Sequence, residues 1–281
     1  MKNRQVWFVT GASQGLGLAL VKSLLQGGYA VAATSRDAQG LRIAIGDPSE
    51  AFLPLEVSLT EEQSVQSAIV QTIAHFGYID VVVNNAGYGQ LGTLEELTDR
   101  EARANFEVNV FGALHVIRNV MPYLRQQRSG KLFNISSIGG LFGSFPGWGI
   151  YCATKFAMAG FTEALAEEVR AFGITATVIY PGYFRTNFLS KGSVRSAQQA
   201  IPEYETARQS EQAHFDSIHG NQPNNPDKAA EAIIALAKEE NPPVHLLLGV
   251  DTIDMLNAKL ERLDSDIKAW ESYTLSTGFS S

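Results

Sequence analysis

Cysteine is nearly absent from this chain, which has one such residue, Cys152, among 281. A single thiol excludes an internal disulfide and any metal site built from several cysteines, and it favours a reducing compartment. Long apolar runs are also absent, because the run at residues 6–9 stops at Thr10 and Gly11. Four residues are too few for a signal-peptide core or a membrane span, so we expect a soluble, cytoplasmic protein without membrane contact.

Basic residues are too few to form a large positive surface. Lys and Arg number 22 against 29 Asp and Glu, which gives a formal net charge of −7. No cluster of Lys and Arg is longer than a pair, so a nucleic-acid partner is not expected. With 45% hydrophobic and 18% charged residues, the chain has the composition of an ordinary globular protein, and its expected partners are small molecules or further copies of itself.

Strand-like and helix-like segments alternate along the chain. Short apolar segments typical of strands lie at residues 5–10, 30–34, 51–55, 81–83, 131–135, 175–179 and 244–248. The segments between them are long enough for crossover helices, and no two-residue hairpin turns join neighbouring strands. We therefore predict one α/β domain over residues 1–281, with a doubly wound parallel sheet of about seven strands and helices on both faces.

Two regions depart from this alternation. At about residues 188–227 the strand signal disappears and polar residues with Asn-Pro and Gln-Pro breaks take over, which predicts a partly helical lid insertion over the carboxyl edge of the sheet. Residues 251–281 carry apolar residues at helical spacing and predict an amphipathic helix that either caps the sheet or modifies an assembly.

A glycine-rich turn follows the first predicted strand, with Gly11, Gly15 and Gly17 in the pattern Gly-x-x-x-Gly-x-Gly. Glycine lets the backbone approach a pyrophosphate whose charge sits at a helix N-terminus. No Lys-Ser or Lys-Thr pair follows, so the turn is not a nucleotide-hydrolysing loop. The alternative is that these glycines end a strand for conformational reasons alone.

The end of the second predicted strand bears on the cofactor. Ser35 stands where an acidic residue would bind a ribose 2′-hydroxyl, and Arg36 follows it. A guanidinium beside a neutral hydroxyl favours a 2′-phosphate, so NADP(H) is predicted over NAD(H). Asp37 leaves the opposite reading open, because it would become the ribose ligand if the strand ran one or two residues further.

Several ordered motifs resemble one known family. They are the turn at residues 10–17, the Asn84-Asn85-Ala86-Gly87 run, Asn109, Ser137, and Tyr151-Cys152-Ala153-Thr154-Lys155. Over about residues 4–187 the chain resembles the short-chain dehydrogenase/reductase family, with its nearest look-alikes in the branch similar to 17β-hydroxysteroid and retinol dehydrogenases. The resemblance implies an oxidoreductase that moves a hydride between a nicotinamide and a carbonyl or alcohol carbon.

Tyr151 and Lys155 are four residues apart in a segment with a helical pattern, so both side chains share one helix face. A carbonyl that accepts a hydride also needs a proton, and a nearby ammonium would lower the pKa of a phenol that supplies it. The resemblance implies that Lys155 also holds the nicotinamide ribose, that Ser137 binds the substrate oxygen and that Asn109 anchors a water. The alternatives are an ordinary amphipathic pair, and an asparagine that bonds its own helix.

The resemblance also assigns the cofactor contacts. They are Gly11, Ser13, Gln14, Gly15, Leu16, Gly17, Ser35, Arg36, Glu56, Val57, Asn85, Ala86, Gly87, Tyr151, Lys155, Pro181, Gly182 and Thr186. Three positions depart from the family pattern. Ser137 precedes Tyr151 by fourteen residues rather than thirteen, which leaves Ser136 as an alternative. Glu56 stands where the family generally has Asp, and Gln14 where many NADP-preferring members have a basic residue.

Apolar and aromatic residues are expected around the catalytic tyrosine, and they suit a mostly apolar ketone or alcohol. The predicted substrate pocket consists of Phe142, Phe145, Trp148, Tyr183 and Phe188. His214 and His219 are expected to be solvated residues of the lid, because further metal ligands are lacking, and no metal site is predicted. Cys152 is interpreted as a packed thiol and not as a nucleophile.

The resemblance implies a homodimer or homotetramer that pairs through the helices containing Asn109 and Tyr151. Three other functions remain open from the sequence. They are a dinucleotide-binding regulatory protein without catalytic activity, an NAD-preferring dehydrogenase, and an epimerase or dehydratase on the same scaffold.

Overall fold

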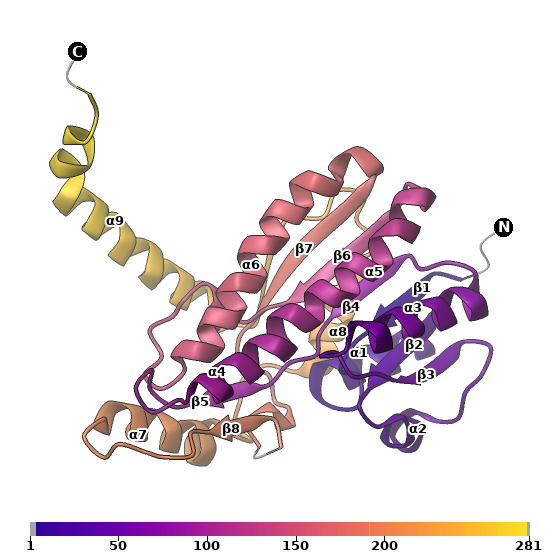
Figure 1. The fold of residues 1–281 in the computed structure, drawn as a ribbon, viewed down its shortest axis with the longest axis horizontal. Coiled ribbons are helices and arrows are strands. Elements are labelled where there is room, and N and C mark those ends of the chain that lie inside the picture. The colour runs from indigo at the N-terminus through magenta and orange to yellow at the C-terminus, as the bar shows by residue number, and fades with distance from the viewer. Residues whose placement is uncertain (1–3, 191, 280–281) are drawn as a thin grey trace.

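A computed structural model describes residues 4–190 and 192–279 of the chain. Its centre is a seven-stranded sheet in the order β3-β2-β1-β4-β6-β7-β9, in which every neighbouring pair is parallel (Figure 1). The strands are β1 (Val6–Val9), β2 (Ala30–Ser35), β3 (Phe52–Glu56), β4 (Val81–Asn84), β6 (Gly130–Ile135), β7 (Ile174–Pro181) and β9 (His245–Leu248). The predicted fold, a parallel seven-stranded α/β sheet, is confirmed.

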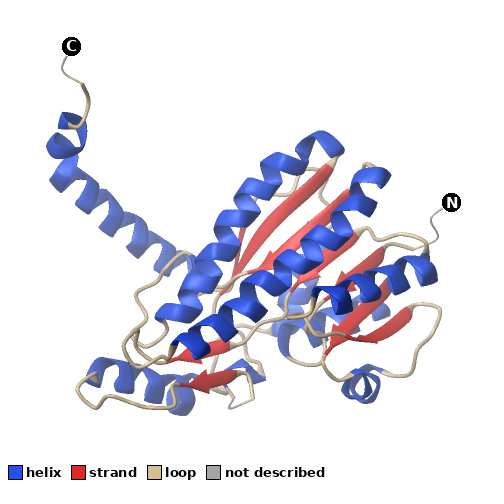
Figure 2. Cartoon of the chain, in the orientation of Figure 1, coloured by secondary structure: helices blue, strands red, loops and turns tan. Residues whose placement is uncertain are grey.

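Helices cover both faces of this sheet, as Figure 2 shows. They are α1 (Gly15–Gln26), α2 (Ala38–Ile45), α3 (Glu62–Phe76), α4 (Asp99–Phe106), α5 (Gly112–Gln127), α6 (Gly149–Val169), α7 (Glu205–Gln212), α8 (Pro226–Leu236) and α9 (Thr252–Ser276). Alternate residues of a strand point to opposite faces, so Trp7 packs with α1, α2 and α8, whereas Phe8 packs with α3, α5 and α6. Strands buried on both faces explain the continuous apolar runs in the sequence.

The strand order reverses between β1 and β4. From β1 the chain moves outward through β2 and β3, and from β4 it moves the other way through β6, β7 and β9. The crossovers on the two sides therefore leave a crevice at the carboxyl ends of β1 and β4, which is where open α/β sheets bind ligands.

The predicted lid contains a strand that the sequence did not reveal. β8 (Val194–Ser196) pairs in parallel with β5 (Gly89–Leu91), in a second, two-stranded sheet beside α7 (Figure 1). β8 has three residues, of which only Val194 is buried. A strand this short and mostly exposed has no apolar pattern of its own, and its partner lies about one hundred residues away in the chain.

The C-terminal helix α9 projects away from the body of the molecule (Figure 1). Thr252 is buried, but every described residue from Leu260 onward is exposed. The alternative in which this segment caps the sheet is therefore wrong. Within the described residues, neither α9 nor any other helix combines the length and apolarity that crossing a bilayer requires.

Candidate active site

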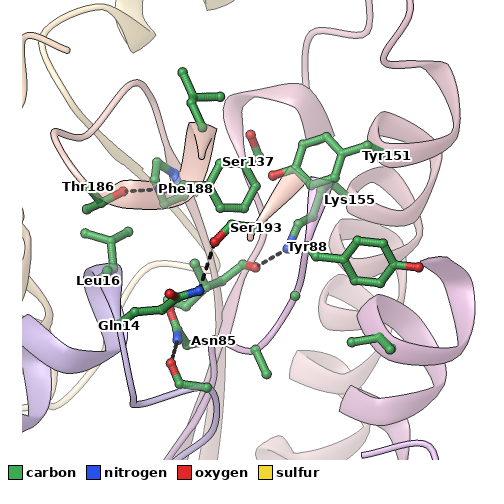
Figure 3. A pocket seen from close by; sticks show the side chains of 18 of the residues that line it. Gln14, Leu16, Asn85, Tyr88, Ser137, Tyr151, Lys155, Thr186, Phe188 and Ser193 are labelled. Atoms are coloured by element: carbon green, nitrogen blue, oxygen red, sulfur yellow. Dashed lines mark hydrogen bonds between the residues drawn. The ribbon is translucent and has the colours of Figure 1, made fainter. Parts of the chain in front are cut away.

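A cavity of about 410 Å³ opens at the carboxyl edge of the sheet. Its walls come from the turn after β1, the ends of β2, β4, β6 and β7, the start of α6, and the segment around β8. Figure 3 shows Ser137, Tyr151 and Lys155 on one side of this cavity and the turn with Gln14 and Leu16 on the other. The crossover of the sheet thus brings together residues from positions 11 to 222 of the chain.

The glycine turn forms a cradle beside the N-terminus of α1. Gly11 and Gly15 have φ angles of +66° and +59°, which side chains rarely tolerate. A Cβ on Gly11 would lie 2.6 Å from the Cα of Ala86. Ser13, Gln14, Gly15 and Leu16 line the cavity together with Gly11. Backbone left bare at a helix N-terminus fits a phosphate group.

Gly17 lies behind this cradle and is not among the residues that line the cavity. A Cβ there would come within 2.4 Å of the carbonyl oxygen of Gly11. The third glycine therefore permits close packing of α1 against the turn. Asn85 reinforces this contact, because its Nδ2 donates to the carbonyl oxygens of Thr10 and Gly11, each at 2.9 Å. Asn85 also lines the cavity, with Ala86 and Gly87.

The residues at the ends of β2 and β3 differ in whether they line the cavity. Ser35 and Arg36 line the cavity, whereas Asp37 does not. The Asp37 carboxylate instead accepts a hydrogen bond from the backbone N–H of Gly40 and caps α2. Val57 lines the cavity, but Glu56, an exposed residue at the end of β3, does not.

Tyr151 and Lys155 lie one turn apart on α6 and are both buried. The Lys155 Nζ is 5.8 Å from the centroid of the Tyr151 ring and donates to the carbonyl oxygen of Ile135 at 2.9 Å. Burial lowers the pKa of Lys155 to about 8. Burial also raises the pKa of Tyr151 well above its ordinary value, although a hydrogen bond with the Ser137 side chain opposes part of this rise. The sequence argument predicted a lowered phenol pKa, and in this structure the desolvation of the phenolate reverses that direction.

Ser136 and Ser137 have different environments. The Ser136 Oγ donates to the carbonyl oxygen of Lys155 at 2.9 Å and so braces α6 against the end of β6. The Ser137 Oγ faces the Tyr151 hydroxyl and accepts from the backbone N–H of Gly139 at 3.0 Å. The geometry therefore favours Ser137 over Ser136 as the residue that works with Tyr151.

Asn109 is fully buried in a short π-helix, Glu107–Phe111, between α4 and α5. Its Oδ1 accepts from the backbone N–H of Tyr88, and its Nδ2 donates to the Tyr88 carbonyl and to the Thr154 Oγ1. It bonds other elements and not its own helix, but it is not among the residues that line the cavity. Such π-turns are frequent at functional sites.

After β7, Pro181, Gly182 and Thr186 all line the cavity. The Thr186 side chain lies 3.8 Å from the position of a Cβ on Gly15, so the two loops face each other. Its Oγ1 accepts from the backbone N–H of Phe188 at 3.2 Å, which begins a short 3-10 turn.

The end of the cavity beside Tyr151 is aromatic. Phe145, Trp148, Tyr183 and Phe188 line it, and the Trp148 ring meets the Tyr151 ring edge-on at 5.5 Å. Phe142 is not among the lining residues and packs against Phe145 at 5.2 Å between ring centroids. Phe142 therefore does not line the pocket as predicted, because its half-buried ring packs on Phe145.

His214 is not the solvated residue that the sequence suggested. It is 7% exposed, lines the cavity and lies 4.9 Å from Trp148 between ring centroids. Its Nδ1 must donate to the carbonyl oxygen of Ser210, at 2.7 Å, because a carbonyl can only accept. Burial lowers the pKa of His214, so the neutral ring offers Nε2 as an acceptor to the Tyr183 hydroxyl at 2.9 Å. The histidine thus orients a phenol at the substrate end.

Cys152 is buried and also touches the cavity. Burial raises the pKa of its thiol to about 12, so the thiolate needed for nucleophilic chemistry is scarce near neutral pH. This agrees with the interpretation of a packed thiol.

Further lining residues come from segments in which the sequence showed no motif. The Gln14 Nε2 donates to the Ser193 Oγ at 2.8 Å and so joins the glycine turn to the lid (Figure 3). Gln222 is 1% exposed, and its Oε1 has no partner among the described residues although it borders the cavity beside Thr186. Arg195 lies over the Tyr88 ring at 4.3 Å. Only the folded lid brings these polar groups to the site.

A phosphate cradle at a helix N-terminus and a Ser-Tyr-Lys group on the opposite wall define a dinucleotide-binding α/β enzyme. The model of the short chain dehydrogenase family matches residues 5–196. The chain belongs to this family of oxidoreductases.

Individual relatives cover almost the whole chain. An oxidoreductase of Botryotinia fuckeliana is 33% identical over 97% of this chain and 99% of its own length. A 3-ketodihydrosphingosine reductase of Bacteroides thetaiotaomicron is 36% identical over 87% of this chain and 88% of its own. The crystal structure of a short-chain dehydrogenase from Streptomyces avermitilis has a TM-score of 0.90 and 35% identity, and covers 99% of this chain and 100% of its own.

Solved structures with 25% identity to this chain and TM-scores of 0.73 and 0.71 are complexes with NADH and with NADP, respectively. Members of the family with this fold therefore bind either form of the dinucleotide. None of the relatives described above is named as a 17β-hydroxysteroid or retinol dehydrogenase, so the branch within the family remains a prediction.

Proposed function

We propose that this protein uses NADP(H) to interconvert a carbonyl and an alcohol in a small, mostly apolar substrate. The observation that carries the proposal is the position of Ser137, Tyr151 and Lys155, which meet at the aromatic end of a cavity whose other end is the glycine turn. A bound nicotinamide would supply or accept the hydride. The chain itself supplies the proton and excludes water from the reacting carbon.

The pKa shifts set the protonation states of Tyr151 and Lys155 at neutral pH. Burial raises the pKa of Tyr151, so its hydroxyl keeps its proton at neutral pH and can give it to the strongly basic oxygen that forms when a carbonyl accepts a hydride. Lys155, with its pKa lowered to about 8, remains mostly cationic at pH 7 and stabilises the phenolate that this transfer leaves. The Ser137 Oγ lies beside the same hydroxyl and can donate to the substrate oxygen.

The choice of NADP(H) rests on the end of β2. Asp37 is engaged as the cap of α2, which removes the competing ribose ligand, while Ser35 and Arg36 face the cavity. A guanidinium near the adenosine ribose, in a site without a carboxylate, favours the 2′-phosphate of NADP(H). Glu56 does not reach the cavity, so Val57 is the proposed neighbour of the adenine.

Fluorescence titration of wild type and Arg36→Ala with NADPH and NADH tests the cofactor. Wild type is expected to bind NADPH more tightly, and Arg36→Ala should lose on the order of tenfold in NADPH affinity with little change for NADH. Arg42→Ala is the control, because Arg42 lies on α2, six residues beyond Arg36, and does not line the cavity. Equal affinity for both nucleotides in the wild type would refute the preference.

The Tyr151→Phe variant tests the chemistry. NADPH consumption with a panel of apolar ketones should fall at least a hundredfold, because the ring stays and only the proton donor goes. NADPH binding should change little. Tyr273→Phe, on the exposed helix α9, should keep full activity. Undiminished turnover in Tyr151→Phe would mean that another group gives the proton.

The substrate is proposed to be a carbonyl compound or alcohol with an apolar body, as in the branch similar to 17β-hydroxysteroid and retinol dehydrogenases, because four aromatic side chains line the cavity beside Tyr151. The relative named as a 3-ketodihydrosphingosine reductase also supports a ketone. The set Asn109, Ser137, Tyr151 and Lys155 is complete, which favours catalysis over a regulatory role. The single cysteine supports a cytoplasmic location.

We also propose that the body assembles as a homodimer or homotetramer through the helices near Asn109 and Tyr151. Phe111 and Phe156 on those helices are 44% and 42% exposed, and such rings are more stable when a partner covers them.

A further inference from the structure

Helix α9 carries a regular apolar seam. Ile253, Leu256, Leu260, Leu263, Ile267 and Trp270 follow one another at alternating intervals of three and four residues. This is the heptad repeat of coiled coils, with Ile253, Leu260 and Ile267 at the a positions and Leu256, Leu263 and Trp270 at the d positions. Charged and small polar residues occupy most of the other positions. We call these six residues the α9 seam.

The α9 seam has no partner within the described part of the chain. Five of its six residues are 46% to 63% exposed, and Leu256 is half-buried. The helix points away from the body, so no other element covers its surface beyond the first turn (Figure 1). A row of large apolar side chains kept in water on a single helix is unstable, because an isolated helix gains most of its stability from burying its apolar face.

The chemistry of the helix favours a second copy of this chain as the partner. A heptad seam is complementary to another heptad seam, since each side chain inserts between four residues of the facing helix. A membrane surface is disfavoured, because acidic residues outnumber basic ones on α9 and anionic lipids attract the opposite charge. Twelve seam residues from two copies would bury on the order of 1,000 Å², at roughly 100 Å² per side chain, which is comparable with a small specific interface.

Charge selects the orientation of the pair. In an antiparallel pair with Leu260 opposite the partner's Leu263, all six seam residues are matched, because Ile253 meets the partner's Trp270 and Leu256 meets the partner's Ile267. The same register sets Lys259 beside the partner's Asp266, twice by symmetry. A shift by one heptad would set Lys259 against itself or Asp266 against itself. A parallel pair would set Asp266 beside the partner's Glu271, and this repulsion offsets the attraction between Lys259 and the partner's Asp264.

We propose that two copies of this protein associate through an antiparallel coiled coil of their α9 helices, in the register that places Leu260 opposite the partner's Leu263. This interface is separate from the surfaces near Asn109 and Tyr151, and it does not depend on the proposed function. In this register Thr252 lies opposite the partner's Glu271, so the bodies would be attached about 28 Å apart along the paired helices.

The mass of the particle in solution tests the association. Sedimentation analysis should show that wild type has at least twice the mass per particle of the double variant Leu260→Glu/Leu263→Glu. The matched control is Ala258→Glu/Ser265→Glu, two exposed α9 residues outside the seam, which should keep the wild-type mass. Circular dichroism of all three proteins checks that the body stays folded. An unchanged mass in the seam variant would overturn the proposal.

Disulfide formation tests the orientation. The variants Leu256→Cys and Ile267→Cys are mixed under mild oxidation, with the buried Cys152 as an internal thiol that stays unreacted. The antiparallel register predicts a mixed disulfide between the two variants and none within either alone, because identical positions would lie about 16 Å apart. Disulfides within each variant alone would show a parallel pair and overturn the orientation. No intermolecular disulfide at all would overturn the seam.

Exchange of the charges tests the register. Lys259→Glu should raise the dimer dissociation constant on the order of tenfold, because it sets two acidic pairs across the interface. Lys259→Glu/Asp266→Lys should restore wild-type affinity. Failure of the second change to rescue the first would overturn the register.

Discussion

At the scale of single residues, burial decides what each ionisable group can do. Tyr151 and Lys155 lie side by side, yet desolvation shifts the pKa of both toward their neutral forms. The phenol therefore holds its proton more firmly, and the lysine gives its proton up more easily, than they would in water. The phenol is therefore a weak acid, which gives its proton only to a strong base such as an alkoxide oxygen.

The buried Lys155 should make stability depend on pH. Between pH 8 and pH 10 the unfolded chain keeps the lysine proton that the folded chain has lost, so the free energy of unfolding should rise with pH in that window. Lys155→Met lacks this group. The free energy of unfolding of wild type minus that of Lys155→Met should therefore become more positive by about 2–3 kcal/mol from pH 8 to pH 10. Urea unfolding of both proteins at each pH measures it.

Lys22→Met is the control for this measurement, since Lys22 is exposed on α1. Its difference from the wild type should stay constant over the same range. If the Lys155→Met difference were also constant, the lysine would have a normal pKa in the folded protein.

At the scale of elements, one buried carboxylate attaches the lid to the body. The Glu96 side chain is fully buried between β5 and α4, accepts from the backbone N–H of Thr93 and Ile201, and pairs with Arg208 of α7 at 2.7 Å. Burial alone would raise the pKa of Glu96, but the backbone hydrogen bonds and Arg208 hold it below its usual value. The anchor is therefore present above the usual carboxyl pKa and weakens as the pH falls below it.

Glu96→Gln should loosen the lid without unfolding the sheet. The amide keeps the shape but loses the charge that pairs with Arg208, at a cost of about 1–3 kcal/mol. We expect faster trypsin cleavage at Arg195 and Arg208, and a higher KM for the ketone with NADPH affinity nearly unchanged. Glu203→Gln, exposed on the same lid, should behave like wild type. Equal cleavage rates for both variants would show that Glu96 does not hold the lid.

At the scale of the whole molecule, the parallel sheet gathers the site at one edge. The glycine turn, the ends of the strands and the lid meet only because every strand of the main sheet ends on the same side. A ligand that fills this cavity contacts both halves of the sheet and should stabilise the entire fold and not one element.

NADPH should therefore raise the melting temperature cooperatively. At a hundredfold excess over its dissociation constant it adds about 2.7 kcal/mol, which corresponds to a shift of about 4–5 °C for a chain of this size. NADH at the same concentration should give a smaller shift. Differential scanning calorimetry with and without each nucleotide measures this, and a larger shift with NADH would contradict the cofactor proposal.

The sequence by itself determined the features that depend on local backbone geometry. Each strand and each crossover helix has its own local apolar pattern, and the alternation of the two patterns predicted a parallel α/β sheet. The glycines at 11, 15 and 17 fixed a turn that only bare backbone can form, and the four-residue spacing of Tyr151 and Lys155 fixed their common helix face.

Only the tertiary structure decided the features that depend on contacts between distant segments. These are the capping of α2 by Asp37, the different contacts of Ser136 and Ser137, the packing of Phe142 on Phe145 and the burial of His214 against Trp148. The direction of the Tyr151 pKa shift belongs with them, because desolvation depends on everything packed around the phenol. Local patterns record neither burial nor a partner one hundred residues away, and those two quantities set the chemistry of this site.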